Sequence, residues 1–166
     1  MDDASLARRL GDALGERDET IAVAESCTGG LLGSTITAVP GSSGYFVGGV
    51  ISYMNATKRR FLAISRESLE RHGAVSEPVA REMARHVRDE ADADWAISTT
   101  GYAGPAAGSD APVGTVYVGI ARAAREAAGA SASAVERFQF DGDRHGVREQ
   151  VVSHALRSTV ERIERE

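Results

Sequence analysis

Apolar residues recur along the chain with two spacings, and each spacing predicts one kind of secondary structure. Where they return every three or four residues, as at Leu6, Leu10 and Leu14, one face of a helix is apolar. Short runs rich in β-branched residues between polar or glycine-rich segments are typical of strands. Helices are predicted over residues 4–16, 31–39, 56–63, 67–72, 77–91 and 143–166. Strands are predicted over residues 20–24, 46–53, 95–99, 113–121 and 134–140.

The order of these elements indicates the fold class. Strands alternate with helices in the first half of the chain and follow one another directly in the second half, which favours an α/β protein with a mixed sheet. We therefore predict a three-layer α/β/α fold, formed as a single domain over residues 1–166. The alanine-, glycine- and serine-rich segment 123–134 is predicted to be a hairpin tip between the last two strands.

Composition and charge exclude several classes of protein. The net charge is -5 and the basic residues form pairs rather than stripes, so we expect no nucleic-acid partner. No apolar run approaches the roughly 18 residues of a membrane span. The acidic start is unlike a secretory signal peptide, so we expect a cytoplasmic protein with no membrane partner. A single cysteine, Cys27, excludes an internal disulfide and a cysteine-based zinc site.

Lysine is almost absent from this chain. Of its 19 basic residues, only Lys58 is lysine. Arginine carries the same charge but does not lose its proton in a protein, so a lone lysine indicates a position that needs a neutral amine. The alternative is an exposed residue that survived by chance.

The segment from Ala24 to Gly30 lies where the first predicted strand ends and a helix begins. Amides at a helix start have no partner within the helix and can bind a phosphate or stabilise an oxyanion, and we expect those from Thr28 to Gly30 to do so here. Ser26 is therefore a candidate nucleophile, although Ser26 or Thr28 could equally be a plain helix N-cap. The neighbouring Cys27 is a competing nucleophile, but side chains alternate along extended backbone, so we expect Cys27 to face the core.

A serine nucleophile needs a base, and Lys58 can serve if its pKa falls. Tyr53 could relay the proton or hydrogen-bond to the amine. The pair differs from the tyrosine and lysine of short-chain dehydrogenases, which are four rather than five residues apart, and no dinucleotide fingerprint follows the first strand. The serine-x-x-lysine motif of penicillin-binding enzymes is also absent.

Three further segments have the composition of substrate-binding loops or of ordinary turns. They are Gly41-Ser42-Ser43-Gly44, Thr100-Gly101-Tyr102-Ala103-Gly104-Pro105 and Gly142-Asp143-Arg144. Arg144 precedes the last predicted helix and could reach an anion there. The histidines show no metal-ligand spacing, so we expect them on the surface or on helices; they are His72, His86, His145 and His154.

Taken together, these segments resemble the C-terminal domain of the competence/damage-inducible proteins, the nicotinamide-nucleotide amidohydrolase family. The resemblance covers residues 4–163 and rests on seven segments that occur in the family's order. They are Ala24-Glu25-Ser26-Cys27-Thr28-Gly29-Gly30, Pro40-Gly41-Ser42-Ser43, Tyr53-x-Asn55-x-x-Lys58, His72-Gly73-Ala74-Val75-Ser76, Thr100-Gly101-x-Ala103-Gly104-Pro105, Pro112-Val113-Gly114-Thr115-Val116 and Gly142-Asp143-Arg144.

The resemblance implies a three-layer α/β fold and hydrolysis of nicotinamide mononucleotide to nicotinic acid mononucleotide and ammonia, without a metal or cofactor. It implies Ser26 as nucleophile, assisted by Lys58 and Tyr53. We expect substrate binding by Thr28, Gly29, Gly30, Ser42, Ser43, Asn55, Thr100, Gly101, Gly104 and Arg144. We also expect a small-molecule nucleotide as substrate and a homo-oligomer.

Two features depart from the family pattern and keep alternatives open. Tyr102 stands where the family usually has isoleucine, so the same chemistry could act on a different amide. Many relatives also carry a preceding domain that resembles molybdopterin-binding proteins, whose activities are not assigned here. The other alternative is a module that binds a nucleotide or a partner protein without catalysis, although intact Ser26, Tyr53 and Lys58 argue against it.

Overall fold

The computed structural model describes residues 1–106, 111–124 and 129–166. The helices are α1 (Asp3–Arg17), α2 (Leu31–Thr37), α3 (Asn55–Leu62), α4 (Arg66–His72), α5 (Glu77–Glu90) and α6 (Arg144–Arg165), with a short 3-10 helix, η1 (Ser42–Gly44). The strands are β1 (Ile21–Glu25), β2 (Phe46–Ile51), β3 (Trp95–Gly101), β4 (Thr115–Arg122) and β5 (Ala132–Gln139). Every predicted helix and strand is therefore present. The predicted hairpin tip lies partly outside the described residues.

The five strands form one mixed sheet in the order β2-β1-β3-β4-β5. β1 lies between β2 and β3 and is parallel to both, with Glu25 opposite Ile51 on one side and Thr99 on the other. β4 and β5 continue the sheet with antiparallel pairing. The parallel half arises because helices connect its strands, whereas β3, β4 and β5 are joined without an intervening helix.

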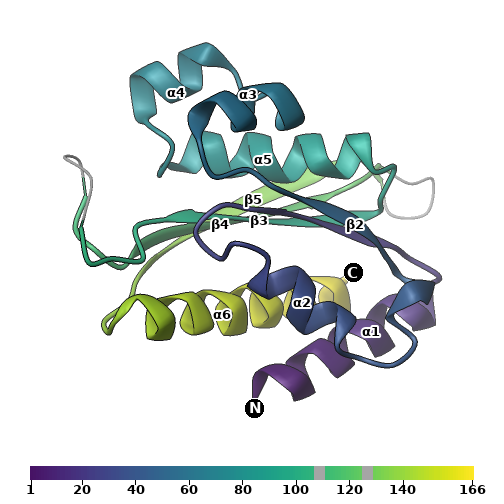
Figure 1. The fold of residues 1–166 in the computed structure, drawn as a ribbon. Coiled ribbons are helices and arrows are strands. Elements are labelled where there is room, and N and C mark those ends of the chain that lie inside the picture. Colours follow the sequence, from purple (N-terminus) through teal and green to yellow (C-terminus); the bar gives the residue numbers. More distant parts are fainter. Residues whose placement is uncertain (107–110, 125–128) are drawn as a thin grey trace.

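Helices cover both faces of the sheet, which confirms the predicted three-layer arrangement (Figure 1). α3, α4 and α5 lie on one face, and α1, α2 and α6 on the other (Figure 1). Each face has its own apolar core. The larger one joins α1, α2 and α6 to residues such as Ile21, Val23 and Ile97, and the smaller one joins α3, α4 and α5 to Ala22, Ala24 and Ala96. Alternate residues of β1 thus serve opposite cores.

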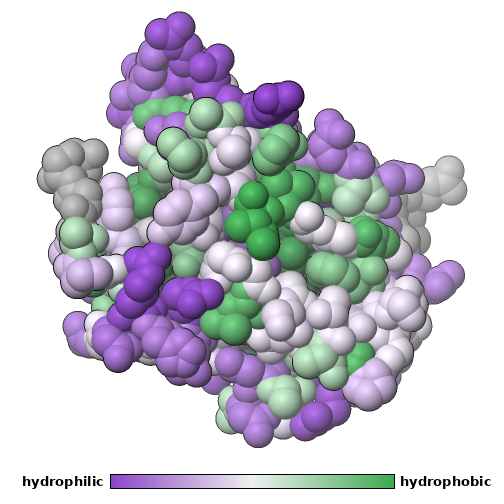
Figure 2. Space-filling model, in the orientation of Figure 1, coloured by the Kyte–Doolittle hydropathy of each residue, from purple (hydrophilic) through white to green (hydrophobic). Residues whose placement is uncertain are grey.

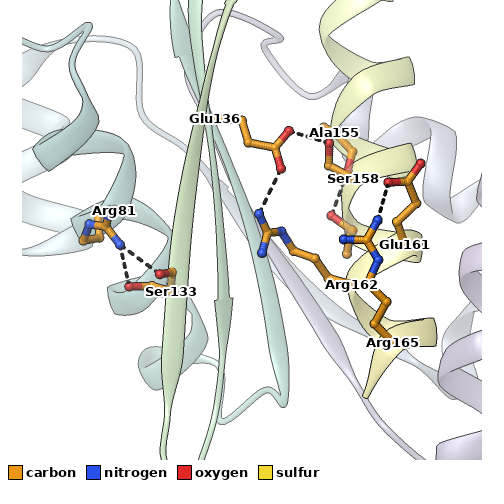
Figure 3. Close-up of polar contacts among 9 residues, drawn as sticks. Arg81, Ser133, Glu136, Ala155, Ser158, Glu161, Arg162 and Arg165 are labelled. Carbon is orange, nitrogen blue, oxygen red and sulfur yellow. Dashed lines mark hydrogen bonds and ion pairs between the residues drawn. The ribbon is translucent and has the colours of Figure 1, made fainter.

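Polar side chains fasten β5, the strand at one edge, to both helical layers (Figure 3). Arg81 of α5 donates to the backbone oxygen and hydroxyl of Ser133, at 2.9 and 3.0 Å. On the other face, Glu136 accepts from Ser158 and Arg162 of α6, at 2.9 and 3.0 Å. These contacts join the edge strand to the helices on both faces of the sheet, and one of them, from Arg81 to the Ser133 oxygen, satisfies a backbone group.

β2 forms the opposite edge and has an apolar exposed surface. Val47 and Ile51 are 47% and 55% exposed, and Tyr53, Met54 and Phe61, which follow in the chain, are also exposed. Figure 2 shows a hydrophobic area on the face of the molecule where β2 lies. Among the described residues, no helix has the length and apolar character that crossing a membrane requires.

Candidate active site

The candidate catalytic residues lie outside the carboxyl ends of the parallel strands. β1 and β3 are neighbours in the sheet. The chain after β1 passes through α2 to β2, on one side of this pair, whereas the chain after β3 passes to β4, on the other side. In open α/β sheets, ligands bind in the crevice that this divergence creates. Ser26 is the first residue after β1, and its amide donates to the Thr99 oxygen of β3 at 2.9 Å.

Ser26 and Lys58, the two residues that the sequence singled out, contact one another beyond the ends of these strands. Lys58 Nζ lies 2.8 Å from Ser26 Oγ, 2.7 Å from the Ser52 carbonyl oxygen and 3.1 Å from the Tyr53 carbonyl oxygen. A neutral amine has two N–H groups and one lone pair. When the two carbonyls accept the two N–H groups, the lone pair is left for the Ser26 hydroxyl. The backbone after β2 therefore orients the amine towards the Ser26 hydroxyl.

Lys58 is also buried, with 1% of its surface exposed, although it lies on the short helix α3. This burial lowers its pKa from 10.5 to about 8, and the nearby Cys27 opposes the shift. No carboxylate lies within ion-pair distance of Lys58 among the described residues. The two carbonyl oxygens thus orient the amine, and no carboxylate stabilises its charged form. Because Lys58 is buried, the alternative of an exposed lysine left by chance is wrong.

Glu25, which sequence reasoning did not single out, supports the turn that carries Ser26. Its carboxylate is 1% exposed and accepts from the amides of Gly30, Leu32 and Gly33, at 2.9, 3.1 and 2.8 Å. It also accepts from the Thr28 hydroxyl at 2.6 Å. Glu25 therefore caps α2, whose N-cap residue is Gly30. The alternative of a plain N-cap by Ser26 or Thr28 is wrong, because the amides at the start of α2 donate to the Glu25 carboxylate and not to either hydroxyl.

The same contacts correct which amides are free to stabilise an oxyanion. We expected the amides from Thr28 to Gly30, but the Gly30 amide donates to Glu25 and the Gly29 amide to the Ser26 oxygen. The amides of Cys27 and Thr28 donate to no other described residue. The free donors are therefore the two amides directly after Ser26, one step earlier than expected.

Cys27 faces the larger core, as predicted from the alternation of side chains. It is 5% exposed and packs among the residues between the sheet and α1, α2 and α6. Burial raises the pKa of its thiol to about 12. A thiol that stays protonated at neutral pH is a poor nucleophile.

Tyr53 contacts Lys58 through its backbone oxygen rather than through its hydroxyl. The hydroxyl lies at the surface and accepts from Arg144 Nη2 at 2.7 Å. Arg144 Nη1 donates to the Gly104 oxygen at 2.5 Å, so Arg144 ties the start of α6 to the loop after β3. The structure therefore brings Tyr53, Gly104 and Arg144 together. It shows no contact from the Tyr53 hydroxyl to Lys58 that could relay a proton.

The other residues of the loop after β3 have structural partners. Thr100 is 1% exposed, and its hydroxyl donates to the Ala74 oxygen at 2.7 Å. A Cβ at Gly101 would lie 2.8 Å from the Thr115 oxygen, so this glycine permits β4 rather than a ligand to approach. Part of the loop, residues 107–110, lies outside the described residues.

Ser42 and Ser43 lie far from Ser26. They belong to η1, which precedes the amino end of β2, whereas Ser26 follows the carboxyl end of β1. The parallel pairing of Ile21 with Phe46 places the two sites at opposite ends of strands that rise about 3.3 Å per residue. The structure therefore does not bring these serines to Ser26, and their role in substrate binding stays a prediction. Asn55 does begin α3, three residues before Lys58.

Two further residues at the site were missed. The Ser52 hydroxyl is fully buried without a hydrogen-bond partner in the part of the chain that the structure describes. Arg148 Nη2 donates to the Thr28 oxygen at 2.7 Å. The helical spacing of Arg144 and Arg148, four residues apart, could have identified the second arginine. Among the described residues, no three His, Cys, Asp or Glu side chains are grouped so that they could hold a metal ion.

Comparison with known proteins agrees with this arrangement. A family model described as the CinA C-terminal domain matches residues 3–163. A CinA-like protein of Chlorobaculum tepidum is 50% identical over 149 residues, which cover 89% of this chain and 35% of that protein. A CinA-like protein of a Cyanothece species is 53% identical over 121 residues, or 72% of this chain and 29% of that protein. The chain thus spans about a third of the length of these relatives.

Solved structures of the same kind have the same fold. The competence damage-inducible protein A of Klebsiella pneumoniae superposes with a TM-score of 0.92 at 32% sequence identity, covering 99% of this chain and 98% of that one. A competence-damaged protein (CinA) superfamily protein of Escherichia coli superposes with a TM-score of 0.85 at 36% identity, covering 93% of this chain and 87% of that one.

Proposed function

Because the chain belongs to the family of CinA C-terminal domains, we propose that it is an amidohydrolase that converts nicotinamide mononucleotide to nicotinic acid mononucleotide and ammonia. The observation that carries the proposal is the 2.8 Å contact between Ser26 Oγ and the buried amine of Lys58, which has no carboxylate partner among the described residues. A serine beside an amine that can be neutral near physiological pH is a nucleophile with its base. We expect the reaction to take place in the cytoplasm.

The first half of the reaction forms an acyl-enzyme. Neutral Lys58 takes the proton of the Ser26 hydroxyl while Oγ attacks the carboxamide carbon, and the carbonyl oxygen becomes an oxyanion. The amides of Cys27 and Thr28 are the donors available to it, and an amide directly after the nucleophile is a common oxyanion donor. Protonated Lys58 then gives its proton to the amide nitrogen, the C–N bond breaks and ammonia leaves.

The second half releases the acid. Lys58, neutral again, takes a proton from water while the water oxygen attacks the ester carbon. The second oxyanion collapses, the bond to Ser26 Oγ breaks, and Lys58 returns the proton to the serine. The positive pyridinium ring of the substrate withdraws electrons from the carbonyl carbon, so a base with a pKa of about 8 is strong enough for the attack.

Ammonia release from nicotinamide mononucleotide tests the proposal. We expect turnover by the wild-type protein and none by Ser26→Ala, with the fold unchanged by circular dichroism. Cys27→Ser is the matched control and should remain active, because the thiol faces the core and serine can keep a hydrogen bond there. Turnover by Ser26→Ala together with a folded, inactive Cys27→Ser would show that the wrong nucleophile was named.

The assay also separates the two remaining functions. Release of ammonia from another carboxamide but not from nicotinamide mononucleotide would assign the same chemistry to a different substrate, and Tyr102 would be the first residue to replace. Tight binding of the mononucleotide without release would indicate a binding module.

A further inference from the structure

Two arginines on one face of α6 contact the segments around Ser26. Arg144 and Arg148 are four residues apart, so their side chains leave the helix on the same side. Arg144 donates to the Gly104 oxygen and the Tyr53 hydroxyl. Arg148 donates to the Thr28 oxygen, and its Nη2 lies 3.7 Å from the position that a Cβ on Gly29 would take. Both guanidinium groups therefore lie beside the turn and loops around Ser26.

In the part of the chain that the structure describes, these two arginines have no acidic partner, whereas eight others have one. The eight are Arg9, Arg66, Arg71, Arg81, Arg88, Arg122, Arg162 and Arg165. The carboxylate nearest in sequence to Ser26, Glu25, is occupied by the amides of α2. Two positive charges are thus left uncompensated at the site, in a protein of net charge -5.

Arg148 also keeps most of its hydrogen-bonding capacity. A guanidinium has five N–H groups, and the described contact to Thr28 uses one of them. The carbonyl contact fixes the plane of the group while leaving the other N–H groups for a ligand. Planar pairs of N–H donors match the oxygens of a phosphate, which is why arginine is common where phosphate is recognised.

We propose that Arg148 is a substrate-binding residue that, together with Arg144, holds the 5′-phosphate of the substrate and makes the site specific for a nucleotide over its nucleoside. The inference rests on the proposed function, because the phosphate is that of the nucleotide whose carboxamide reacts at Ser26. The Cα atoms of Thr28 and Ser26 are at most about 7 Å apart, so Arg148 lies a short distance from the nucleophile.

The experiment compares nicotinamide mononucleotide with nicotinamide riboside, which lacks the phosphate. For Arg148→Gln we expect a fall in kcat/KM of about 10- to 100-fold for the mononucleotide, mainly through KM, and less than a twofold change for the riboside. Arg148→Lys should recover part of the loss. Arg157→Gln, on the same helix but exposed, is the matched control and should behave as wild type.

An equal fall with both substrates would overturn the proposal, because it would show that Arg148 only supports the turn through Thr28. Unchanged kinetics would overturn it as well. If the wild-type protein releases no ammonia from either compound, the proposed function fails separately. In that case, calorimetric binding of the mononucleotide and of inorganic phosphate decides: weaker binding of the mononucleotide by Arg148→Gln but not by Arg157→Gln supports the phosphate site, and equal binding refutes it.

Discussion

At the scale of single residues, the properties of Lys58 follow from its surroundings rather than from its own chemistry. Two backbone oxygens, those of Ser52 and Tyr53, orient the amine, while burial lowers its pKa to about 8. A carboxylate beside the amine would raise the pKa again and keep the lysine charged. The separation of Glu25 from Lys58 is therefore part of what makes Lys58 suitable as a base.

Replacing Lys58 by arginine tests whether the neutral amine matters. Lys58→Arg keeps the positive charge but cannot take a proton from Ser26, so we expect the rate to fall at least 100-fold. In the wild-type protein, kcat should rise with pH up to about 8 and then level off, because Lys58 is active when it has lost its proton. The measurement is ammonia release between pH 6 and 10. Arg59→Lys, exposed on the same helix, is the control.

A variant Lys58→Arg with normal activity and the wild-type pH profile would remove Lys58 from the chemistry. The anchoring of an anion would then explain the residue better, since arginine binds phosphate at least as well as lysine does.

At the scale of elements, Glu25 stabilises the start of α2 and its connection to β1. A helix of seven residues is too short to be stable alone. The buried carboxylate satisfies three of its free amides and so joins the helix to the end of β1. The turn between them, which presents Ser26, is held by the same contacts.

Replacing Glu25 by glutamine should weaken this turn. The amide NH2 of Gln cannot accept from backbone N–H groups, so we expect the free energy of unfolding to fall by about 2 kcal/mol. We also expect a lower kcat with little change in KM, because the orientation of Ser26 is disturbed. Urea unfolding and steady-state kinetics measure the two effects. Glu77→Gln, exposed at the start of α5, is the control, and an equal response of both variants would argue against the role of Glu25.

The packing of α5 on the sheet gives a second prediction at this scale. A Cβ at Gly119 would lie 2.5 Å from the Ala80 oxygen and 2.4 Å from Ser98 Oγ, so Gly119→Ala should cost about 1–3 kcal/mol. At Gly15, near the end of α1, a Cβ would meet nothing within 4 Å, and Gly15→Ala should stabilise the fold by about 0.5–1 kcal/mol. Urea unfolding measures both changes. Equal effects of the two substitutions would refute this account of the α5 interface.

At the scale of the whole molecule, the buried lysine links the stability of the fold to pH. The pKa of Lys58 is about 8 in the folded protein and 10.5 in an exposed lysine. Below pH 8 the folded state carries a buried charge. Between about pH 8 and 10.5 the folded protein loses this proton while the unfolded chain still binds it, so the free energy of unfolding rises with pH.

The variant Lys58→Met isolates this effect, since it fills the same space without a titrating group. We expect the stability of wild type relative to Lys58→Met to increase by up to about 3 kcal/mol across that pH range. The free energy of urea unfolding of both proteins, measured at pH 7, 9 and 10.5, gives the difference, in which the titration of other groups cancels. A constant difference would show that the pKa of Lys58 is not lowered. The expected homo-oligomer stays a prediction, and sedimentation of the same samples tests it.

The sequence by itself determined the helices and strands, and it identified a candidate nucleophile and a candidate base. Apolar spacing predicted the α-helices and strands that the structure describes, because burial on one face repeats with the period of the element, but not the short η1. Gly73 caps the end of α4, and Pro78 lies in the first turn of α5. The single lysine and the serine after the first strand identified the candidate base and nucleophile before their 2.8 Å contact was known.

Only the tertiary structure decided which groups are free to act and which have partners. Glu25 binds the Gly30 amide, one of those expected for the oxyanion. The Thr100 hydroxyl binds the Ala74 oxygen, and parallel pairing places Ser42 at the far end of the sheet. Arg148 reaches Thr28 across 120 residues of sequence. Local sequence fixes which donors and acceptors a segment carries, but their partners come from distant segments, and packing alone brings these together.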